Sequence, residues 1–134
     1  MTAAAVPAPV VYLDTSAAVK LISDEQETDG LRSYLDEGRA VVSSDLLETE
    51  LRRIGVRHGI DQVLITAVLD GVTMIPLTRE QFREAGLFPQ AGLRSLDALH
   101  LAGALGIEAS AILTYDIRLG EAARAHGLAV IAPE

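Results

Sequence analysis

The chain has 134 residues, of which 49% are hydrophobic and 22% charged, a composition that suits one folded domain and argues against intrinsic disorder. It contains no cysteine, so disulfide bonds and thiolate metal sites are excluded, and any bound metal ion must be held by oxygen or imidazole. The formal net charge of −8 disfavours a nucleic-acid partner without excluding one, because the ligands of a carboxylate metal site would supply part of that charge.

The N-terminal residues 1–9 include Pro7 and Pro9 but no basic residue and no sustained apolar run. We expect an irregular lead-in to the first strand here rather than a signal peptide. No stretch of the chain approaches the ~18 consecutive apolar residues of a membrane span. These features predict a single domain over residues 1–134, in a cytoplasmic protein.

The first half of the chain alternates short apolar runs with helical patterns. Residues 10–13 predict a buried strand, and the N-cap residues that follow it lead into a helix over 17–22. A helix is then expected over 27–37, ended by Gly38, and a strand over 40–42. Ser43 and Ser44 are expected to open a third helix that ends near Gly59. The apolar stripe of this third helix is Leu46, Leu47, Leu51 and Ile54. A fourth helix is expected over 61–71, with the apolar residues Val63, Leu64, Ala67 and Val68.

The second half continues the alternation. Residues 72–77 predict a short strand, which Pro76 places at an edge of the sheet. A helix capped by Thr78 is expected through Ala85, then a loop over 86–92 and a nearly all-apolar helix that Ser95 opens and that continues to 105. The remaining predictions are a buried strand over 111–114, a helix over 117–126 and a strand over 129–131. This order is typical of an α/β fold with a parallel sheet.

Two aspartates, Asp14 and Asp116, each follow a buried strand. Ligands of open α/β sheets bind at the carboxyl ends of the strands, so both residues stand where a site would form. Each is equally placed to act as a helix N-cap, a purely structural role.

Two further acids occupy helices. Glu50 follows Leu46 and Leu47 by four and three residues, which puts it on or beside the stripe that faces the sheet, whereas Glu48 points elsewhere and is expected to be solvated. A glutamate there needs either a buried arginine or a bound cation. Asp97 lies in the first turn of the apolar helix, where interaction with the helix N-terminus is the structural alternative. His100, one turn later, is expected to be packed or to support the site.

Four carboxylates in one cleft would repel one another, and a hard divalent cation removes that penalty. Oxygen ligands without cysteine favour Mg²⁺, with Mn²⁺ as a substitute. Such sites activate water and position a phosphodiester for in-line displacement. The pattern therefore predicts a metal-dependent nuclease in which Asp14, Glu50, Asp97 and Asp116 are both metal ligands and catalytic residues.

Four motifs give the chain a family resemblance. They are Val-Val-Tyr-Leu-Asp-Thr-Ser-Ala at 10–17, Val-Ser-Ser-Asp-Leu-Leu-Glu-Thr-Glu-Leu at 42–51, Arg-Ser-Leu-Asp-Ala-Leu-His-Leu-Ala at 94–102 and Leu-Thr-Tyr-Asp-Ile-Arg-Leu at 113–119. In this order, and with the closing Gly-Leu-Ala-Val-Ile-Ala-Pro, the sequence resembles the PIN-domain ribonucleases, and within them the VapC-type toxins of VapBC toxin–antitoxin modules.

The resemblance implies a three-layer α/β/α sandwich with a parallel sheet of about five strands, in which the first and fourth strands are adjacent. It places the four acids on the family's acidic quartet and matches Thr15, Ser16 and Thr114 to the hydroxyls that support it. It also implies a Mg²⁺-dependent endoribonuclease acting on tRNA- or rRNA-type RNA, a homodimer, and a cognate VapB-type antitoxin that can insert an arginine into the acidic pocket. The residues that directly follow Asp116 are Ile117, Arg118 and Leu119, with no further acid among them, which leaves a second metal open.

Other functions fit the residues less well. A haloacid-dehalogenase-type phosphatase needs a second aspartate two positions after the first, where this chain has Ser16, and a receiver domain needs an acidic pair and a late lysine that are not evident. The stronger alternative is a catalytically silent PIN-like module that acts by dimerisation and antitoxin binding. Arg52, Arg53 and Arg57 are candidates for phosphate contact, or equally for a solvated or dimer-facing edge.

Overall fold

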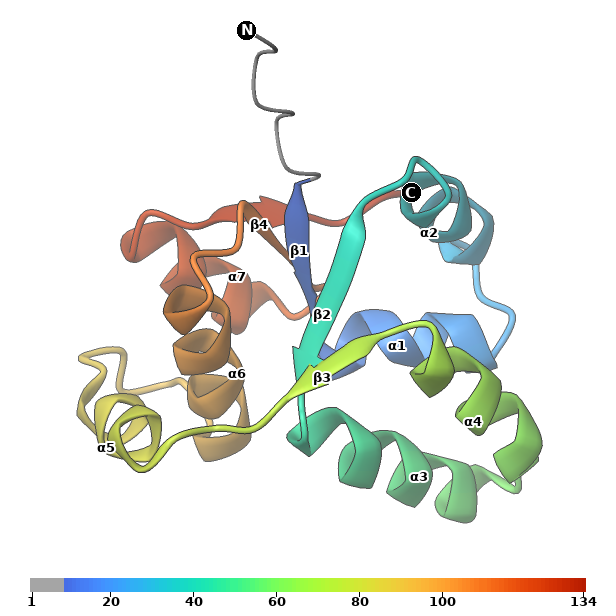
Figure 1. The fold of residues 1–134 in the computed structure, drawn as a ribbon, viewed down its shortest axis with the longest axis horizontal. Coiled ribbons are helices and arrows are strands. Elements are labelled where there is room, and N and C mark those ends of the chain that lie inside the picture. Colours follow the sequence, from blue (N-terminus) through green and yellow to red (C-terminus); the bar gives the residue numbers. More distant parts are fainter. Residues whose placement is uncertain (1–8) are drawn as a thin grey trace, which may run out of the picture.

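The computed structural model describes residues 9–134 and shows a central sheet between two layers of helices (Figure 1). Except for Pro9, the lead-in expected at the N-terminus lies outside the described residues.

The sheet has five strands, all parallel, in the order β3-β2-β1-β4-β5. They are β1 (Val10–Leu13), β2 (Ala40–Ser44), β3 (Thr73–Ile75), β4 (Ala111–Leu113) and β5 (Ala129–Ile131). The central strand β1 pairs in register with β4, from Val11 with Ala111 to Leu13 with Leu113. From β1 the chain adds β2 and β3 on one side of the sheet, and it then adds β4 and β5 on the other side. The carboxyl ends of β1 and β4 therefore lie at the switch point where α/β folds bind ligands.

Helices cover both faces of the sheet. Figure 1 shows α1 (Thr15–Ile22), α2 (Thr28–Leu35), α3 (Leu46–His58) and α4 (Gln62–Asp70) on one side, and α5 (Arg79–Leu87), α6 (Ser95–Gly106) and α7 (Ile117–Ala125) on the other. Alternate residues of β1 point to opposite faces of the sheet. Val11 and Leu13 pack against the layer of α1 to α4, and Tyr12 packs against α6 and α7. The α/β sandwich with adjacent first and fourth strands is as expected.

Ser43 and Ser44 do not open a helix, contrary to the expectation from sequence. Both are buried at the end of β2, paired with Met74 and Ile75 of β3. Their hydroxyls find partners across the sheet, since Ser43 Oγ donates to the Leu13 carbonyl at 2.8 Å and Ser44 Oγ accepts from the Tyr12 hydroxyl at 2.9 Å. Side-chain hydrogen bonds of this kind let polar residues extend a buried strand.

Other differences concern helix bounds and faces. In α4 the buried residues are Ile65 and Leu69, while Val63 and Leu64 are exposed by 75% and 43%. Of the apolar residues named from sequence, Val68 packs partly against the core, and the fully buried face was not identified. The helix α5 runs two residues further than expected, into the predicted loop, and α2 ends two residues earlier. No helix within residues 9–134 is both long and apolar enough to cross a lipid bilayer.

Candidate active site

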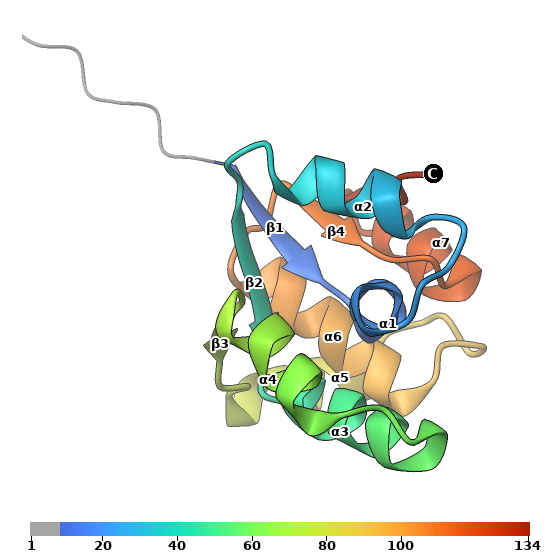
Figure 2. The ribbon, with the colours of Figure 1, turned by 90° about the vertical axis from the view of Figure 1, so that its right-hand side faces the viewer.

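Asp14 is the N-cap of α1 and directly follows Leu13, the last residue of β1. Figure 2 shows the end of β1 leading into α1. Its side chain is 2% exposed. One carboxylate oxygen, Oδ2, accepts from Ser16 Oγ at 2.7 Å and from Thr114 Oγ1 at 2.8 Å, and it caps α1 through the Ser16 amide at 3.3 Å. The partners of Oδ2 fix the carboxylate, so the N-cap role and a functional role coexist in one residue.

Glu50 lies in the middle of α3 and is held by a histidine. His100 Nε2 is 2.6 Å from Glu50 Oε1, and Thr15 Oγ1 donates to the same oxygen at 3.1 Å. The other ring nitrogen, His100 Nδ1, lies 2.7 Å from the Tyr12 hydroxyl, which donates to Ser44 Oγ. This buried chain of hydrogen bonds orients Glu50 from the core outward, and Glu50 remains 22% exposed at its end.

The electrostatics of His100 follow from these contacts. Complete burial on its own would lower the pKa of the imidazole, but the hydrogen bond to Glu50 and the negative charges of Asp14, Glu50 and Asp97 outweigh it. The pKa of His100 is therefore raised above its ordinary value. The phenol of Tyr12 has its pKa raised to about 12, chiefly by burial, and stays neutral.

Asp97 lies in the first turn of α6, half-buried. Burial and the negative charges of Asp14 and Asp116, with a smaller contribution from Glu50, raise the pKa of Asp97 from 3.8 to about 6, and the charge of His100 opposes them. The site thus carries more negative charge than its own side chains neutralise.

Asp116 enters the site from the other helix layer. It follows β4 and is the N-cap of α7, where Oδ1 accepts from the Leu119 amide at 2.9 Å. Its own amide donates to Thr114 Oγ1 at 3.1 Å, the hydroxyl that also donates to Asp14. Thr114 therefore links the two strand-end aspartates.

The four acids line one cavity of about 330 Å³, together with Thr15, Ser16, Arg94, Ser95 and Leu96. Within residues 9–134, no three acidic or histidine side chains lie close enough together to enclose a metal ion, so the carboxylates surround the cavity rather than meet at one point. By chemistry they suit a hard divalent cation, because every acidic ligand is an oxygen and their mutual repulsion is expressed in the raised pKa of Asp97.

The structure brings all the sequence-predicted site residues into one place. Thr15, Ser16 and Thr114 each donate to one of the acids, and Glu48 is exposed, paired with Arg52 at 3.0 Å. Sequence reasoning missed the role of Tyr12, which was expected only as part of a buried strand and whose hydroxyl contacts His100. His100 is buried and contacts Glu50, in line with the expectation that it is packed or supports the site. The sequence signal for both is a polar group on an otherwise apolar element.

Comparison with known proteins places the chain among related sequences and folds. The family model described as "PIN domain" matches residues 11–125. Ribonuclease VapC47 of Mycobacterium tuberculosis is 39% identical over 132 residues, covering 92% of this chain and 97% of the relative. Among solved structures, the Mycobacterium tuberculosis toxin VapC20, described as cleaving the sarcin-ricin loop, superposes with a TM-score of 0.73 at 14% identity, covering 92% of this chain and 99% of that one. VapBC2 of Rickettsia felis, solved bound to a DNA fragment from its promoter, gives 0.72 at 19% identity, covering 93% and 99%.

Proposed function

The chain belongs to the PIN-domain family, in its VapC branch, and we propose that it is a Mg²⁺-dependent endoribonuclease, the toxin of a type II toxin–antitoxin module. The observation that carries the proposal is the cavity that Asp14, Glu50, Asp97 and Asp116 line at the carboxyl ends of β1 and β4. Its relative VapC47 is named a ribonuclease, and an acidic cavity of this kind serves that chemistry.

A divalent cation held by these four carboxylates, Mg²⁺ or Mn²⁺ in its place, would supply Lewis-acid activation of a water molecule and neutralise charge at a phosphodiester. The chain's own residues prepare for this. Ser16 and Thr114 hold one oxygen of Asp14, and no hydroxyl within residues 9–134 bonds to the other, Oδ1. His100 and Thr15 hold Glu50 in the same way, which lowers the cost of ordering both carboxylates.

The proposed partners follow from the relatives. A VapB-type antitoxin is supported by the similarity to VapBC2 of Rickettsia felis, and an RNA substrate by the similarity to VapC20, described as cleaving the sarcin-ricin loop. Whether the substrate is a tRNA or a ribosomal RNA stays a prediction. A homodimer is proposed on the same family basis. The RNA target itself would be identified by sequencing RNA ends after induced expression.

The test of the proposal is Asp14→Asn. The amide oxygen of asparagine can accept from Ser16 and Thr114 as the carboxylate does, so the variant is expected to fold. Cleavage of a broad RNA panel in Mg²⁺ should decrease about a thousandfold or more, because a charged ligand is lost. Glu48→Gln, which removes an acid of α3 outside the cavity, should cut as fast as wild type.

Two outcomes would contradict the proposal. Cleavage by Asp14→Asn at the wild-type rate would show that the acidic cavity is not the active site. Wild-type protein that cuts nothing in the panel and binds no Mn²⁺ by calorimetry would favour the alternative of a catalytically silent module acting through dimerisation and antitoxin binding.

A further inference from the structure

A second cavity adjoins the acidic one, and arginines line it. It has a volume of about 290 Å³, and its lining includes Arg94, Asp97, Asp116 and Arg118. Arg94 is the N-cap residue of α6 and Arg118 lies in the first turn of α7, so the helix starts that present two of the acids also present two exposed cations. Within residues 9–134 neither guanidinium lies within ion-pair distance, 4.0 Å, of any carboxylate.

The opposite helix layer presents a matching pair. Arg53 and Arg57 follow Glu50 by three and seven residues, one and two turns along the same side of α3. Both are exposed, and within the described part of the chain neither makes an ion pair. Their neighbour Arg52 differs, because it is tied to Glu48 at 3.0 Å, to Gln62 at 3.0 Å and to Thr66 at 3.2 Å.

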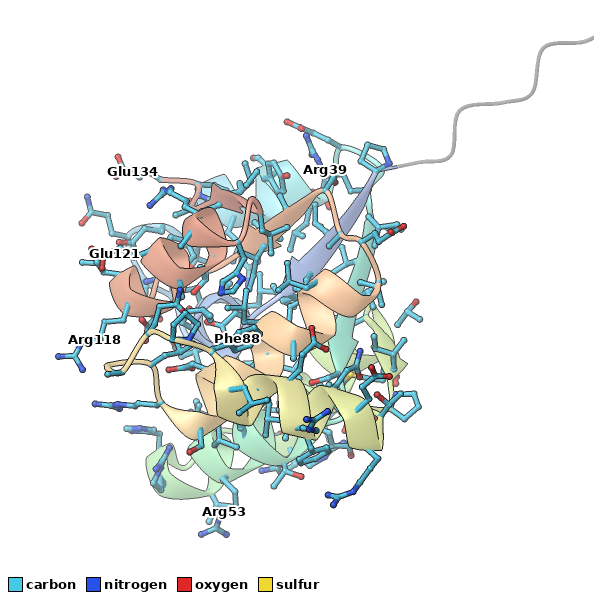
Figure 3. The ribbon with its side chains drawn as sticks, turned by 90° about the vertical axis from the view of Figure 1, so that its left-hand side faces the viewer. Arg39, Arg53, Phe88, Arg118, Glu121 and Glu134 are labelled. Atoms are coloured by element: carbon cyan, nitrogen blue, oxygen red, sulfur yellow. The ribbon has the colours of Figure 1, made fainter. Side chains whose placement is uncertain are left out.

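The lack of an ion pair does not by itself distinguish these arginines, since Arg79 and Arg83 make none within residues 9–134 either. What sets them apart is that they lie on α3, α6 and α7 or at their starts, the elements that present Glu50, Asp97 and Asp116. Arg39 and Arg52 both use available glutamates. Arginines that stay unpaired beside a cavity lined with carboxylates keep five N–H donors each for a ligand that is not part of the chain. Figure 3 shows Arg118 and Arg53 extending away from α7 and α3 into solvent.

We propose that Arg53, Arg57, Arg94 and Arg118, here called the arginine rim, bind backbone phosphates of RNA on the two sides of the acidic cavity. The inference rests on the proposed nuclease function. An RNA strand whose scissile phosphate lies at the acidic cavity places its neighbouring phosphates outside that cavity, toward α3 on one side and toward α6 and α7 on the other. Guanidinium groups bind phosphate bidentately, so the rim offsets the repulsion that a chain of net charge −8 exerts on RNA.

The experiment compares three double variants that remove the same charge: Arg94→Gln/Arg118→Gln, Arg53→Gln/Arg57→Gln, and the control Arg79→Gln/Arg83→Gln. The control pair is exposed, unpaired within residues 9–134 and four residues apart on α5, as Arg53 and Arg57 are on α3, but it lines a different cavity. The matched charge change separates local phosphate contact from the general field of the protein.

Binding is measured by fluorescence anisotropy with a labelled single-stranded RNA of mixed sequence, on an Asp116→Asn background in Mg²⁺, between about 50 and 200 mM KCl. Each phosphate contact to a single strand contributes about 0.7 to the slope of log Kd against log salt, so each rim double variant should lower the slope by about 1.4. Affinity at the lower salt should decrease about tenfold or more, while the control keeps the parent slope.

Cleavage kinetics with the acidic residues intact give the second readout. In Arg53→Gln/Arg57→Gln, whose arginines do not line the acidic cavity, the loss of phosphate contacts should raise KM and leave kcat near the wild-type value. Arg94→Gln/Arg118→Gln should raise KM as well, but Arg94 lines that cavity, so its kcat is not used as a test. Rim variants with the parent salt slope and the wild-type KM would overturn the proposal, and so would variants that lose only affinity for a purified antitoxin, since the rim would then be a protein contact.

The two proposals fail separately. If wild type cleaves RNA and the rim variants match it, the nuclease function stands and the arginine rim does not. If wild type cleaves nothing but binds RNA with a salt slope that the rim variants lose, the rim stands and catalysis does not.

Discussion

Replacing Asp97 by Asn is expected to stabilise the metal-free protein at neutral pH. Burial and the negative charges of Asp14 and Asp116 raise the pKa of this carboxyl from 3.8 to about 6, so the folded state binds a proton there more tightly than the unfolded state. The stability that the group contributes is therefore greatest below pH 3.8 and is lost as the pH rises through about 6. Asparagine is uncharged at every pH and escapes that loss.

The magnitude follows from the shift. A change of about two pKa units corresponds to about 3 kcal/mol at 1.36 kcal/mol per unit. Asp97 is only half-buried, so water screens the charge, and we discount the gain at neutral pH to about 1–1.5 kcal/mol. For a domain of this size that gain raises the melting temperature by about 3–6 °C.

The assay is thermal unfolding in EDTA at pH 7.5 and at pH 4, followed by circular dichroism. Asp29→Asn is the matched control, because Asp29 is also in the first turn of a helix but is exposed, and its loss should slightly lower stability. Adding Mg²⁺ should raise the melting temperature of wild type and hardly affect Asp97→Asn. The reasoning is refuted if Asp97→Asn is no more stable than wild type at pH 7.5, or if its advantage is undiminished at pH 4.

Two further predictions concern packing around the site. Tyr12→Phe keeps the ring but leaves His100 Nδ1 and Ser44 Oγ without the hydroxyl that joins them. The free energy of unfolding, measured in urea, should therefore decrease by about 1–3 kcal/mol. A decrease too small to measure would contradict the buried chain of hydrogen bonds. Gly55→Ala should destabilise the protein by about 1–3 kcal/mol, because a Cβ there would overlap the side chain of Ile65. Gly86→Ala lies in open space on α5 and should stabilise the protein by about 0.5–1 kcal/mol in the same measurement. Equal effects of the two substitutions would be inconsistent with this packing.

The sheet and the acidic residues were predictable because their signals are local. Most strands are short apolar runs, and two of the acids come after such runs, Asp14 directly and Asp116 within three residues. Glu50 was recognisable from its helical phase alone, which leaves it facing the sheet.

The wrong prediction at the end of β2 has a physical origin, which is that tertiary partners override local preference. Ser43 and Ser44 have the sequence signature of a helix start, yet the Leu13 carbonyl and the Tyr12 hydroxyl keep them in the strand. His100 is packed and supports the site, as expected, but the acid that it contacts, Glu50, is 50 positions earlier in the chain. Helical spacing describes neighbours within one element and contains no information about such pairs.

The pairing of β1 with β4 also sets when the site can exist during synthesis. Thr114, which holds Asp14, comes 100 residues after it, and Asp116 comes later still. At roughly 5–20 residues per second, a ribosome needs roughly 5–20 s to add that stretch. Until then the first half of the chain holds Asp14 and Glu50 without the other two acids. A product of interrupted translation that stops before Asp116 therefore lacks the complete site. Under the proposed function, such a product would not cleave RNA.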